Sequence, residues 1–306
     1  MHSKTFRSEL LLLLASAIWG FAFVAQRVGM EHIGPFLYNG IRFALGSLAL
    51  LPLILIRSRH SDRPHAQAPF LSRRTMKFGG FVGVVLFCGA SLQQTGIVST
   101  TAGKAGFITG LYVVIVPVLG LFVRQRSGLG TWVGALIAAA GLYLLSMTGR
   151  FEISRGDFLV LCSAFFWAGH VLLIGGLSKK FDVVKLAFMQ FAVCSVLSLI
   201  SALAVETIIL NKIVDAAIPI LYGGLLSVGV AYTLQVVAQQ HTPPAHTAII
   251  LSLETVFAVI GGWLILSETI PPRGLAGCAL MLVGILLSQG RWHRGAPKPS
   301  SKHSRR

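Results

Sequence analysis

The sequence predicts an all-α integral membrane protein whose ten transmembrane helices form two inverted five-helix repeats. The first observation is composition, because 54% of the 306 residues are hydrophobic and only 12% are charged, whereas a soluble domain carries about 25% charged residues. The second is a series of apolar runs close to the length of about 20 residues that crosses a bilayer. The third is a faint sequence repeat between the two halves of the chain.

Ten apolar runs divide the chain into two sets of five spans, with polar segments between them. The longest polar segment, residues 57–77, carries six Lys or Arg residues together with Pro64 and Pro69, and is too polar and Pro-broken to cross a membrane. The expected spans are residues 10–26, 35–56, 78–98, 103–123 and 129–147 in the first set, and residues 158–177, 183–205, 217–238, 245–266 and 274–289 in the second.

Polar segments also frame the two sets. Ala15-Ser16-Ala17 resembles the cleavage site of a signal peptide, which is an alternative for the first run. The run continues past this site through Trp19 and Phe23, which favours a retained first helix. The expected organisation is a cytoplasmic lead over residues 1–9, a first repeat over 10–148, a connecting loop over 149–157, a second repeat over 158–290 and a basic, disordered cytoplasmic tail over 291–306.

Positive charge is unevenly distributed between the two sides of the membrane that ten spans define. One side receives 18 Lys and Arg residues and the other receives 6. Because cytoplasmic loops carry the excess of Lys and Arg, we expect both termini in the cytoplasm and the chain in the cell inner (plasma) membrane. The net charge of +16 does not indicate nucleic-acid binding, since the charges lie between apolar runs rather than along one face with aromatic residues among them.

The internal repeat relates the second five spans to the first. An offset of 148 positions places Trp19 on Trp167, and an offset of 142 after the basic loop places Gln93 on Gln235. The offset changes only in predicted loops, as expected for a duplicated unit. Because five is odd, the two units enter the membrane from opposite sides, an architecture of secondary transporters that bind substrate near the midplane. Further equivalent pairs are Glu9 and Asp157, Phe43 and Phe191, Ser47 and Ser195, and Ile108 and Ile250. In the last pair of spans the offset is 143, which places Gly134 on Gly277 and Gly141 on Gly284.

Several segments, taken in order, resemble a known family. They are "ASAIWGFAFVAQR", "YNGIRFALG", "TTAGKAGFITGLYVVIVPVLG", "AYTLQVVAQQHTPPAHTAIILSLETVFAVIGGWLILSE" and "GLAGCALMLVGILLS". Together they resemble the two EamA domains of the drug/metabolite transporter (DMT) superfamily. The resemblance implies ten helices in an inverted repeat, cytoplasmic termini, and export or exchange of a small metabolite, often an amino acid. The ninth span departs from the pattern, since Leu253-Glu254-Thr255 stands where Leu-Glu-Pro is common, so a weaker helix break is expected there.

Two charged residues lie within equivalent spans. Lys104 opens the fourth span, and Glu254 lies near the middle of the ninth. An unpaired charge deep in lipid costs several kcal/mol, so each is expected to have a partner or water. Lys104 is a candidate to hold a substrate carboxylate, or it reaches the outer headgroups from the helix end. Glu254 is a candidate for a substrate amine or a coupling proton.

Polar side chains in other spans are further candidates for substrate binding. Arg42 lies in the second span and could read an acid group through bidentate contacts, although a structural ion pair is an alternative. The repeat places Gln190 opposite it. Gln93 and Gln235 are equivalent to each other and could offer paired amides to a substrate, with hydrogen bonding between helices as the alternative.

Aromatic residues and one histidine complete the predicted site. Trp19, Trp167, Tyr112 and Tyr232 could form apolar or cation–π walls for a ligand, although aromatic residues in spans also serve as packing or interface anchors. His170 is a candidate for substrate or proton binding, with a buried neutral histidine as the alternative.

Neither a catalytic nor a metal-binding motif is found in the sequence, which has no phosphate-binding loop and no clustered Cys and His pattern. We therefore expect no enzyme activity, no metal and no cofactor, and a driving force supplied by a gradient or by a partner. Expected partners are a small-molecule substrate, the lipid bilayer, and a coupling proton or ion; the oligomeric state is left open. Three alternatives remain. One is efflux of lipophilic cations or drugs, and two come from other classes: a membrane-embedded enzyme acting on lipid-linked substrates, and a membrane sensor or scaffold that does not transport.

Overall fold

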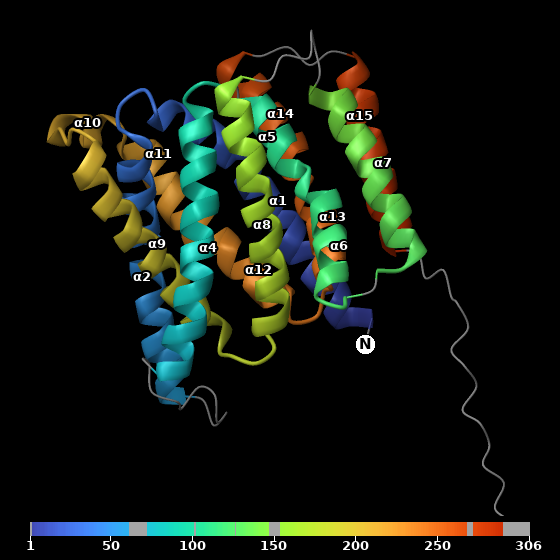
Figure 1. Cartoon of the computed structure of the whole chain (residues 1–306), viewed down its shortest axis with the longest axis horizontal. Helices are drawn as coiled ribbons and strands as arrows, with labels where there is room; N and C mark the ends of the chain where they lie inside the picture. Colours follow the sequence, from blue (N-terminus) through green and yellow to red (C-terminus); the bar gives the residue numbers. More distant parts are fainter. Residues whose placement is uncertain are drawn as a thin grey trace, which may run out of the picture.

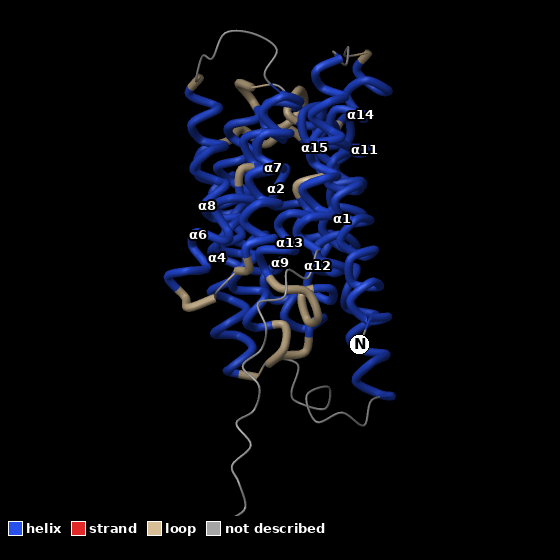
Figure 2. The backbone as a smooth tube through the Cα atoms, turned by 90° about the vertical axis from the view of Figure 1, so that its right-hand side faces the viewer, coloured by secondary structure: helices blue, strands red, loops and turns tan. Residues whose placement is uncertain are grey.

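Long helices that run side by side make up the part of the chain that the computed structural model describes, residues 2–60, 72–100, 102–125, 127–146, 154–267 and 272–289 (Figure 1). A view from the side shows that these residues form helices and connecting turns, without a strand (Figure 2). The predicted all-α class is thereby confirmed. The predicted tail, residues 291–306, lies outside the described residues.

The helices of the two halves follow one another in a similar order. Those of the first half are α1 (His2–Gly29), α2 (Pro35–His60), α4 (Arg73–Ile97), α5 (Ala102–Gly110), α6 (Tyr112–Phe122) and α7 (Leu129–Ser146). Those of the second half, which include a π-helical segment labelled η1, are α8 (Arg155–Leu177), α9 (Val183–Val205), α10 (Leu210–Asp215), α11 (Ala217–Leu221), η1 (Tyr222–Tyr232), α12 (Thr233–Ala238), α13 (Pro244–Leu251), α14 (Glu254–Leu266) and α15 (Pro272–Gln289).

Eight helical stretches of the described residues are long and apolar enough to cross a membrane, and each overlaps a predicted span. The two remaining predicted spans, residues 129–147 and 274–289, correspond to the shorter apolar helices Leu129–Leu144 and Pro272–Ser288. α1 begins at His2, within the predicted lead, so the first helix is longer than the apolar run alone. The eight stretches are Lys4–Gly29, Pro35–Ile56, Arg73–Ile97, Ala102–Phe122, Arg155–Leu177, Val183–Val205, Ala217–Ala238 and Pro244–Ile265.

Two spans are broken at positions that the repeat makes equivalent. One break lies at Leu111, between α5 and α6, and the other at Ser252 and Leu253, between α13 and α14. In each, the N–H of the leucine donates to the carbonyl oxygen three residues back rather than four, at 3.2 Å. The sequence predicts a weaker break in the second span, because it lacks the proline that is common there. The break nevertheless forms without that proline. Thr255 stands at that position, and its hydroxyl donates to Gly106 O on α5 at 2.9 Å, which ties the two broken spans together.

Equivalent helices of the two halves pack on each other in antiparallel directions. α5 contacts α14 and α6 contacts α13, so the two broken spans run opposite ways. α2 and α9 pack likewise: the Ser195 hydroxyl donates to Gly40 O at 2.8 Å, and the rings of the equivalent residues Phe43 and Phe191 lie 6.2 Å apart. The packing of the bundle therefore follows the internal repeat.

Glycines allow α7 and α15 to approach closely. A Cβ atom at Gly134 would lie 2.5 Å from Gly284 O, and one at Gly141 would lie 2.6 Å from Gly277 O. No side chain fits at such distances, so this antiparallel contact depends on the absence of side chains at these positions. The four glycines are two pairs of repeat-equivalent residues, and each pairs with the non-equivalent member of the other helix.

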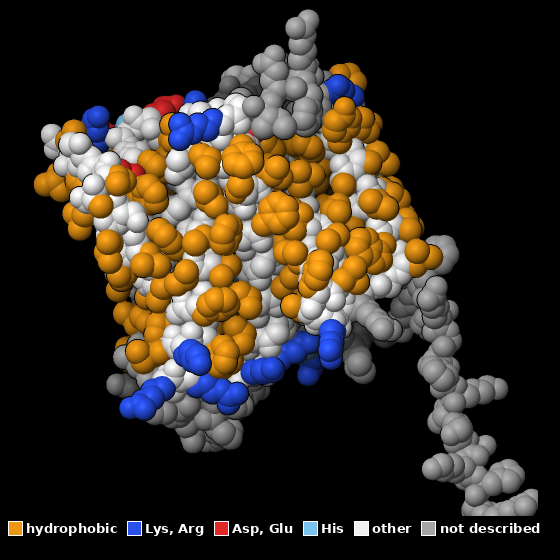
Figure 3. Space-filling view, viewed as in Figure 1, with side chains coloured by type: hydrophobic (Ala, Val, Ile, Leu, Met, Phe, Trp, Pro, Cys, Tyr) orange, Lys and Arg blue, Asp and Glu red, His pale blue; other side chains and the backbone are white. Residues whose placement is uncertain are grey.

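Apolar side chains cover the face of the bundle seen in Figure 3, and Lys and Arg gather along its lower edge. This edge is the end at which α4 begins and α8 ends (Figure 1). Exposed basic residues there include Arg73, Arg74 and Lys77 at the start of α4, and Lys179 and Lys180 after α8. A wide apolar belt with a basic edge is typical of a protein that lies in a bilayer.

Candidate substrate site

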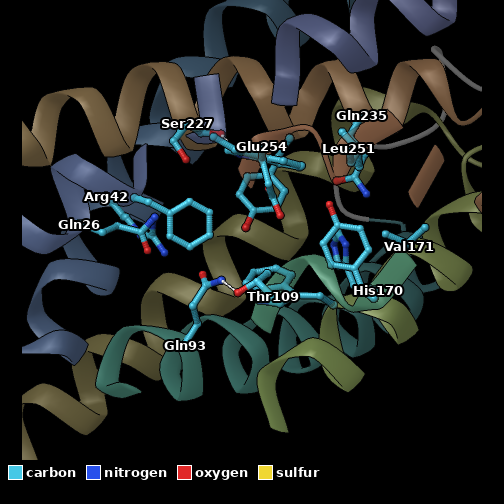
Figure 4. A pocket seen from close by; sticks show the side chains of 15 residues that line it. Gln26, Arg42, Gln93, Thr109, His170, Val171, Ser227, Gln235, Leu251 and Glu254 are labelled. Carbon is cyan, nitrogen blue, oxygen red and sulfur yellow. Dashed lines mark hydrogen bonds between the residues drawn. The ribbon is translucent and has the colours of Figure 1, made fainter. Parts of the chain in front are cut away.

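A cavity lies between helices of both halves, where the two broken spans are interrupted. Its lining mixes aromatic rings with polar and charged side chains (Figure 4). The residues that line it are Trp19, Phe23, Gln26, Arg42, Gln93, Thr109, Tyr112, Trp167, His170, Val171, Ser227, Tyr232, Gln235, Leu251 and Glu254.

Glu254 is the first residue of α14 and is 4% exposed. Its Oε1 atom has no hydrogen-bond partner within the described residues. Tyr112, the first residue of α6, lies close enough to interact electrostatically with this carboxyl group, but its hydroxyl also makes no hydrogen bond within that part of the chain. Burying a polar atom without a hydrogen bond costs free energy, so a ligand, a proton or water that reaches Glu254 in the cavity would stabilise it.

Arg42 lines the other side of the cavity and is 2% exposed. Its Nε atom donates to Asn39 Oδ1 at 3.0 Å, and Asn39 Nδ2 donates to Ala90 O at 3.1 Å. The guanidinium carbon lies 5.4 Å from the ring centroid of Tyr38 and 5.0 Å from that of Phe43. Within the described residues no carboxylate pairs with this guanidinium. Asn39 orients Arg42, and the terminal nitrogens that bind a carboxylate in bidentate geometry stay available to the cavity.

Tyr232 is the centre of an aromatic wall on the cavity. Its ring centroid lies 4.6 Å from that of Trp19 and 6.1 Å from that of Trp167, the two repeat-equivalent tryptophans. Trp19 Nε1 donates to Ser227 O in η1 at 3.2 Å, whereas Trp167 Nε1 has no hydrogen-bond partner within the described residues. Such a wall offers π-faces to an apolar group or a cation.

His170 also lines the cavity, and a buried glutamine outside the cavity lining holds it by a hydrogen bond. Its Nε2 atom donates to Gln190 Oε1 at 2.7 Å. Gln190 is fully buried and does not line the cavity, although the sequence places it among the candidate residues. Gln190 therefore acts on the cavity through its hydrogen bond with His170. The other ring nitrogen of His170 is an acceptor when the ring is neutral.

The two equivalent glutamines reach the cavity from α4 and α12 with different partners. Gln93 Nε2 donates to the hydroxyl of Thr109 at 2.9 Å (Figure 4). Gln235 Nε2 donates to Gln239 Oε1 at 3.1 Å, and its own Oε1 atom has no hydrogen-bond partner within the described residues. The acceptor of Gln235 is thus open to a ligand donor.

Lys104, a sequence candidate to hold a substrate carboxylate, is not among the residues that line the cavity. Its Nζ atom lies 2.6 Å from Asp157 Oδ2, at the start of α8. The physical reason is its position in the first turn of α5, a full two turns before the break at Leu111 that opens onto the cavity. The ammonium group of Lys104 therefore pairs with Asp157, a carboxylate of the chain itself.

Six of the lining residues are not among the sequence candidates. A signal was present for some of them: Phe23 and Gln26 follow Trp19 at helical spacing on one face, and the repeat places Val171 on Phe23. Ser227 gave no such signal, because its place depends on the course of η1. The six are Phe23, Gln26, Thr109, Val171, Ser227 and Leu251.

Both members of several repeat-equivalent pairs line this cavity. They include Trp19 with Trp167, Gln93 with Gln235, Phe23 with Val171, Thr109 with Leu251, and Tyr112 with Glu254. A cavity lined from both halves of a bundle of membrane-length helices is typical of a multi-pass membrane protein and is the candidate ligand site of this one.

The chain belongs to the EamA-like transporter family, which matches residues 6–147 and 154–289. A protein of Archaeoglobus fulgidus named as an uncharacterized transporter is 31% identical over 93% of this chain and 86% of its own length. A probable amino-acid metabolite efflux pump of Salmonella typhimurium is 30% identical over 52% of this chain and 50% of its own length. A crystal structure of a protein with 14% sequence identity has a TM-score of 0.75 over 92% of this chain and 96% of that chain, a likeness of fold. Family and relatives point to transport rather than to enzyme catalysis.

Proposed function

We propose that this chain is a secondary transporter that exports or exchanges a small zwitterionic metabolite, such as an amino acid, by alternating access. In this proposal ten helices form two inverted halves in the cell inner membrane, with both termini in the cytoplasm. The antiparallel packing of α2 with α9, of the two broken spans, and of α7 with α15 supports the inverted arrangement. The basic residues at the end of the bundle where α1 begins support the orientation.

One observation carries the choice of substrate: the cavity exposes one cation and one carboxylate that do not pair with each other. Arg42 and Glu254 both line it, and they are not within ion-pair distance. A zwitterion of matching length satisfies both, with its carboxylate at Arg42 and its amine at Glu254. The aromatic wall around Tyr232 then contacts the remainder of the substrate.

Efflux of lipophilic cations is the second candidate, because the same wall and Glu254 also suit a cation without a carboxylate. In that case Glu254 is the only counter-charge needed and Arg42 opposes binding. The two candidates therefore predict opposite effects of removing the charge of Arg42. Glu254 takes a coupling proton in either case if substrate and proton occupy it alternately.

The test uses purified full-length protein. A ligand is first identified by thermal stabilisation across a library of amino acids and amines, since a ligand that binds the folded state raises its apparent stability. Transport of the best amino acid, and of the amine that lacks its carboxylate, is then measured in proteoliposomes. Arg42→Gln is expected to raise KM for the amino acid by about 30-fold or more, because a buried charge contact is lost, and to leave the amine unaffected.

Arg74→Gln is the matched control, because it removes the same charge from an exposed position at the start of α4 and should change neither KM. An equal loss for both substrates in Arg42→Gln would contradict the assignment of the carboxylate to this residue. Improved transport of the amine would favour the lipophilic-cation candidate.

A further inference from the structure

Two contacts between an acidic and a basic side chain lie outside the cavity and join the first half of the chain to the second. One connects α1 with α13, and the other connects α5 with α8. All four helices also line the cavity, through Trp19, Leu251, Thr109 and Trp167. Neither contact has a role in the binding of substrate described above.

The first contact centres on His246, at the start of α13. Its Nε2 atom lies 3.0 Å from Glu9 Oε1, and its Nδ1 atom lies 2.9 Å from the hydroxyl of Ser288 on α15. Ser288 also donates its hydroxyl to Ile285 O at 2.7 Å. An ionised Glu9 only accepts, so the Nε2–H of His246 is the donor in this contact. The two side chains are 11% and 20% exposed.

The second contact is the ion pair between Lys104 Nζ and Asp157 Oδ2 at 2.6 Å, with Asp157 only 2% exposed. Thr100 donates its hydroxyl to the other oxygen of Asp157 at 2.7 Å. Asp157 also caps α8 together with Ser154. Asp157 therefore accepts from Lys104 and Thr100 and from the backbone at the start of α8. The pair is a charge-assisted contact.

The two contacts are equivalent under the internal repeat. The offset of 148 that places Trp19 on Trp167 also places Glu9 on Asp157, and the offset of 142 that places Gln93 on Gln235 also places Lys104 on His246. Each half thus contributes one acid from its first helix and one base from its fourth span. The acid of each half pairs with the base of the other.

The two pairs lie at opposite ends of the bundle. Arg27, eighteen residues after Glu9 on α1, is about 27 Å further along the helix axis. Its guanidinium donates to Val98 O at 3.2 Å. Thr100, two residues after Val98, donates to Asp157. The Lys104–Asp157 pair therefore lies at the end of α1 that is remote from Glu9, and the cavity lies between the two pairs.

We propose that the Glu9–His246 and Lys104–Asp157 pairs are the two gates of the transporter, each of which holds the halves together on one side of the cavity. This inference rests on the proposed function, because alternating access requires one side to separate while the other remains closed. Separation of α1 from α13 breaks only the first pair, and separation of α5 from α8 breaks only the second. Loss of either pair shifts the population toward the state open at that end.

The test follows the accessibility of the cavity without any substrate, so it stands whether or not the zwitterion assignment holds. Val171 lines the cavity and is changed to cysteine in full-length protein whose four native cysteines are replaced. A membrane-impermeant maleimide is applied to vesicles of each orientation. Glu9→Gln is expected to increase labelling by about threefold or more from the side of Met1, and Lys104→Met by a similar factor from the opposite side.

Lys104→Met leaves Asp157 in place as the cap of α8, so its effect reports the pair and not the cap. His246→Gln and Asp157→Asn test the same two contacts from the other partner if either first variant does not fold. Asp182→Asn is the control, since Asp182 caps α9 within the second half. Labelling that rises from the same side in both gate variants, or that stays at the level of the control in both, would overturn the proposal. Labelling that does not change in the gate variants, together with transport that does change, would contradict the gates and leave the proposed substrate site in place.

Discussion

The two halves of the chain contribute equivalent positions to the cavity but different chemistry. Packing residues match: Phe43 and Phe191 are the same residue type and contact each other. Charged residues do not match, because Arg42 in the first half corresponds to Gln190, and Glu254 in the second half corresponds to Tyr112. The framework is thus symmetric and the site is not.

This difference follows from what each part of the molecule contacts. Helices that pack on their own repeat-equivalents meet the same shape from both sides, so equal residues suit both. A zwitterion has one cationic and one anionic end, so a cavity that binds it must offer unlike groups to the two ends. The gates need an acidic and a basic side chain at both ends of the bundle, and there the two halves supply equivalent pairs.

The largest expected effect on transport comes from Glu254, the charged residue of the repeat-equivalent pair Tyr112 and Glu254. Glu254→Gln removes the only carboxylate among the residues that line the cavity, and should lower kcat/KM for amino-acid transport by about 100-fold or more. Tyr112→Phe removes only a hydroxyl that makes no hydrogen bond within the described residues, and should lower it by less than about 10-fold. Transport in proteoliposomes measures both. Losses of equal size would show that the asymmetry of this pair does not matter to the substrate.

A second test perturbs the symmetric framework. Gly134→Ala places a Cβ atom 2.5 Å from Gly284 O, and overpacking of this kind costs about 1–3 kcal/mol of stability. Gly169→Ala on α8 meets nothing within 4 Å, and alanine is the better helix former by up to about 1 kcal/mol. The apparent melting temperature should fall in the first variant and stay level or rise in the second. A fall of the same size in both would disprove the close contact of α7 with α15.

The smallest effect is expected from the two glutamines. Gln235→Ala removes an acceptor that is open to the substrate, and should raise KM by about 3- to 10-fold, the value of one hydrogen bond. Gln93→Ala removes an amide that already donates to Thr109, and should raise KM by less. Side-by-side uptake curves for the two variants decide the order. A larger effect of Gln93→Ala would reverse the comparison between the halves.

Several features of the site could be predicted from the sequence because they depend on local pattern. Trp19, Glu254 and Gln235 are polar or aromatic residues inside apolar runs, and lipid does not accept them readily, so a cavity was expected near them. Lys104 satisfied the same criterion and yet lies outside the cavity. Its depth in the bundle and its distance from Asp157 depend on how helices from different halves are placed. Gln190 likewise lies outside the cavity lining, behind His170. The rotation of α9 about its axis decides which of its residues line the cavity.

The helical class, the approximate spans and the internal repeat can be read from the amino-acid sequence alone, since hydrophobicity and spacing are properties of short segments. The contacts of Glu9 with His246 and of Lys104 with Asp157 depend on how the helices pack, because each pair joins residues far apart in the chain. The tertiary structure also decides that Arg42 and Glu254 share one cavity without pairing. The physical reason is that polarity tells which groups need a partner, whereas the packing of helix faces tells which partner they obtain.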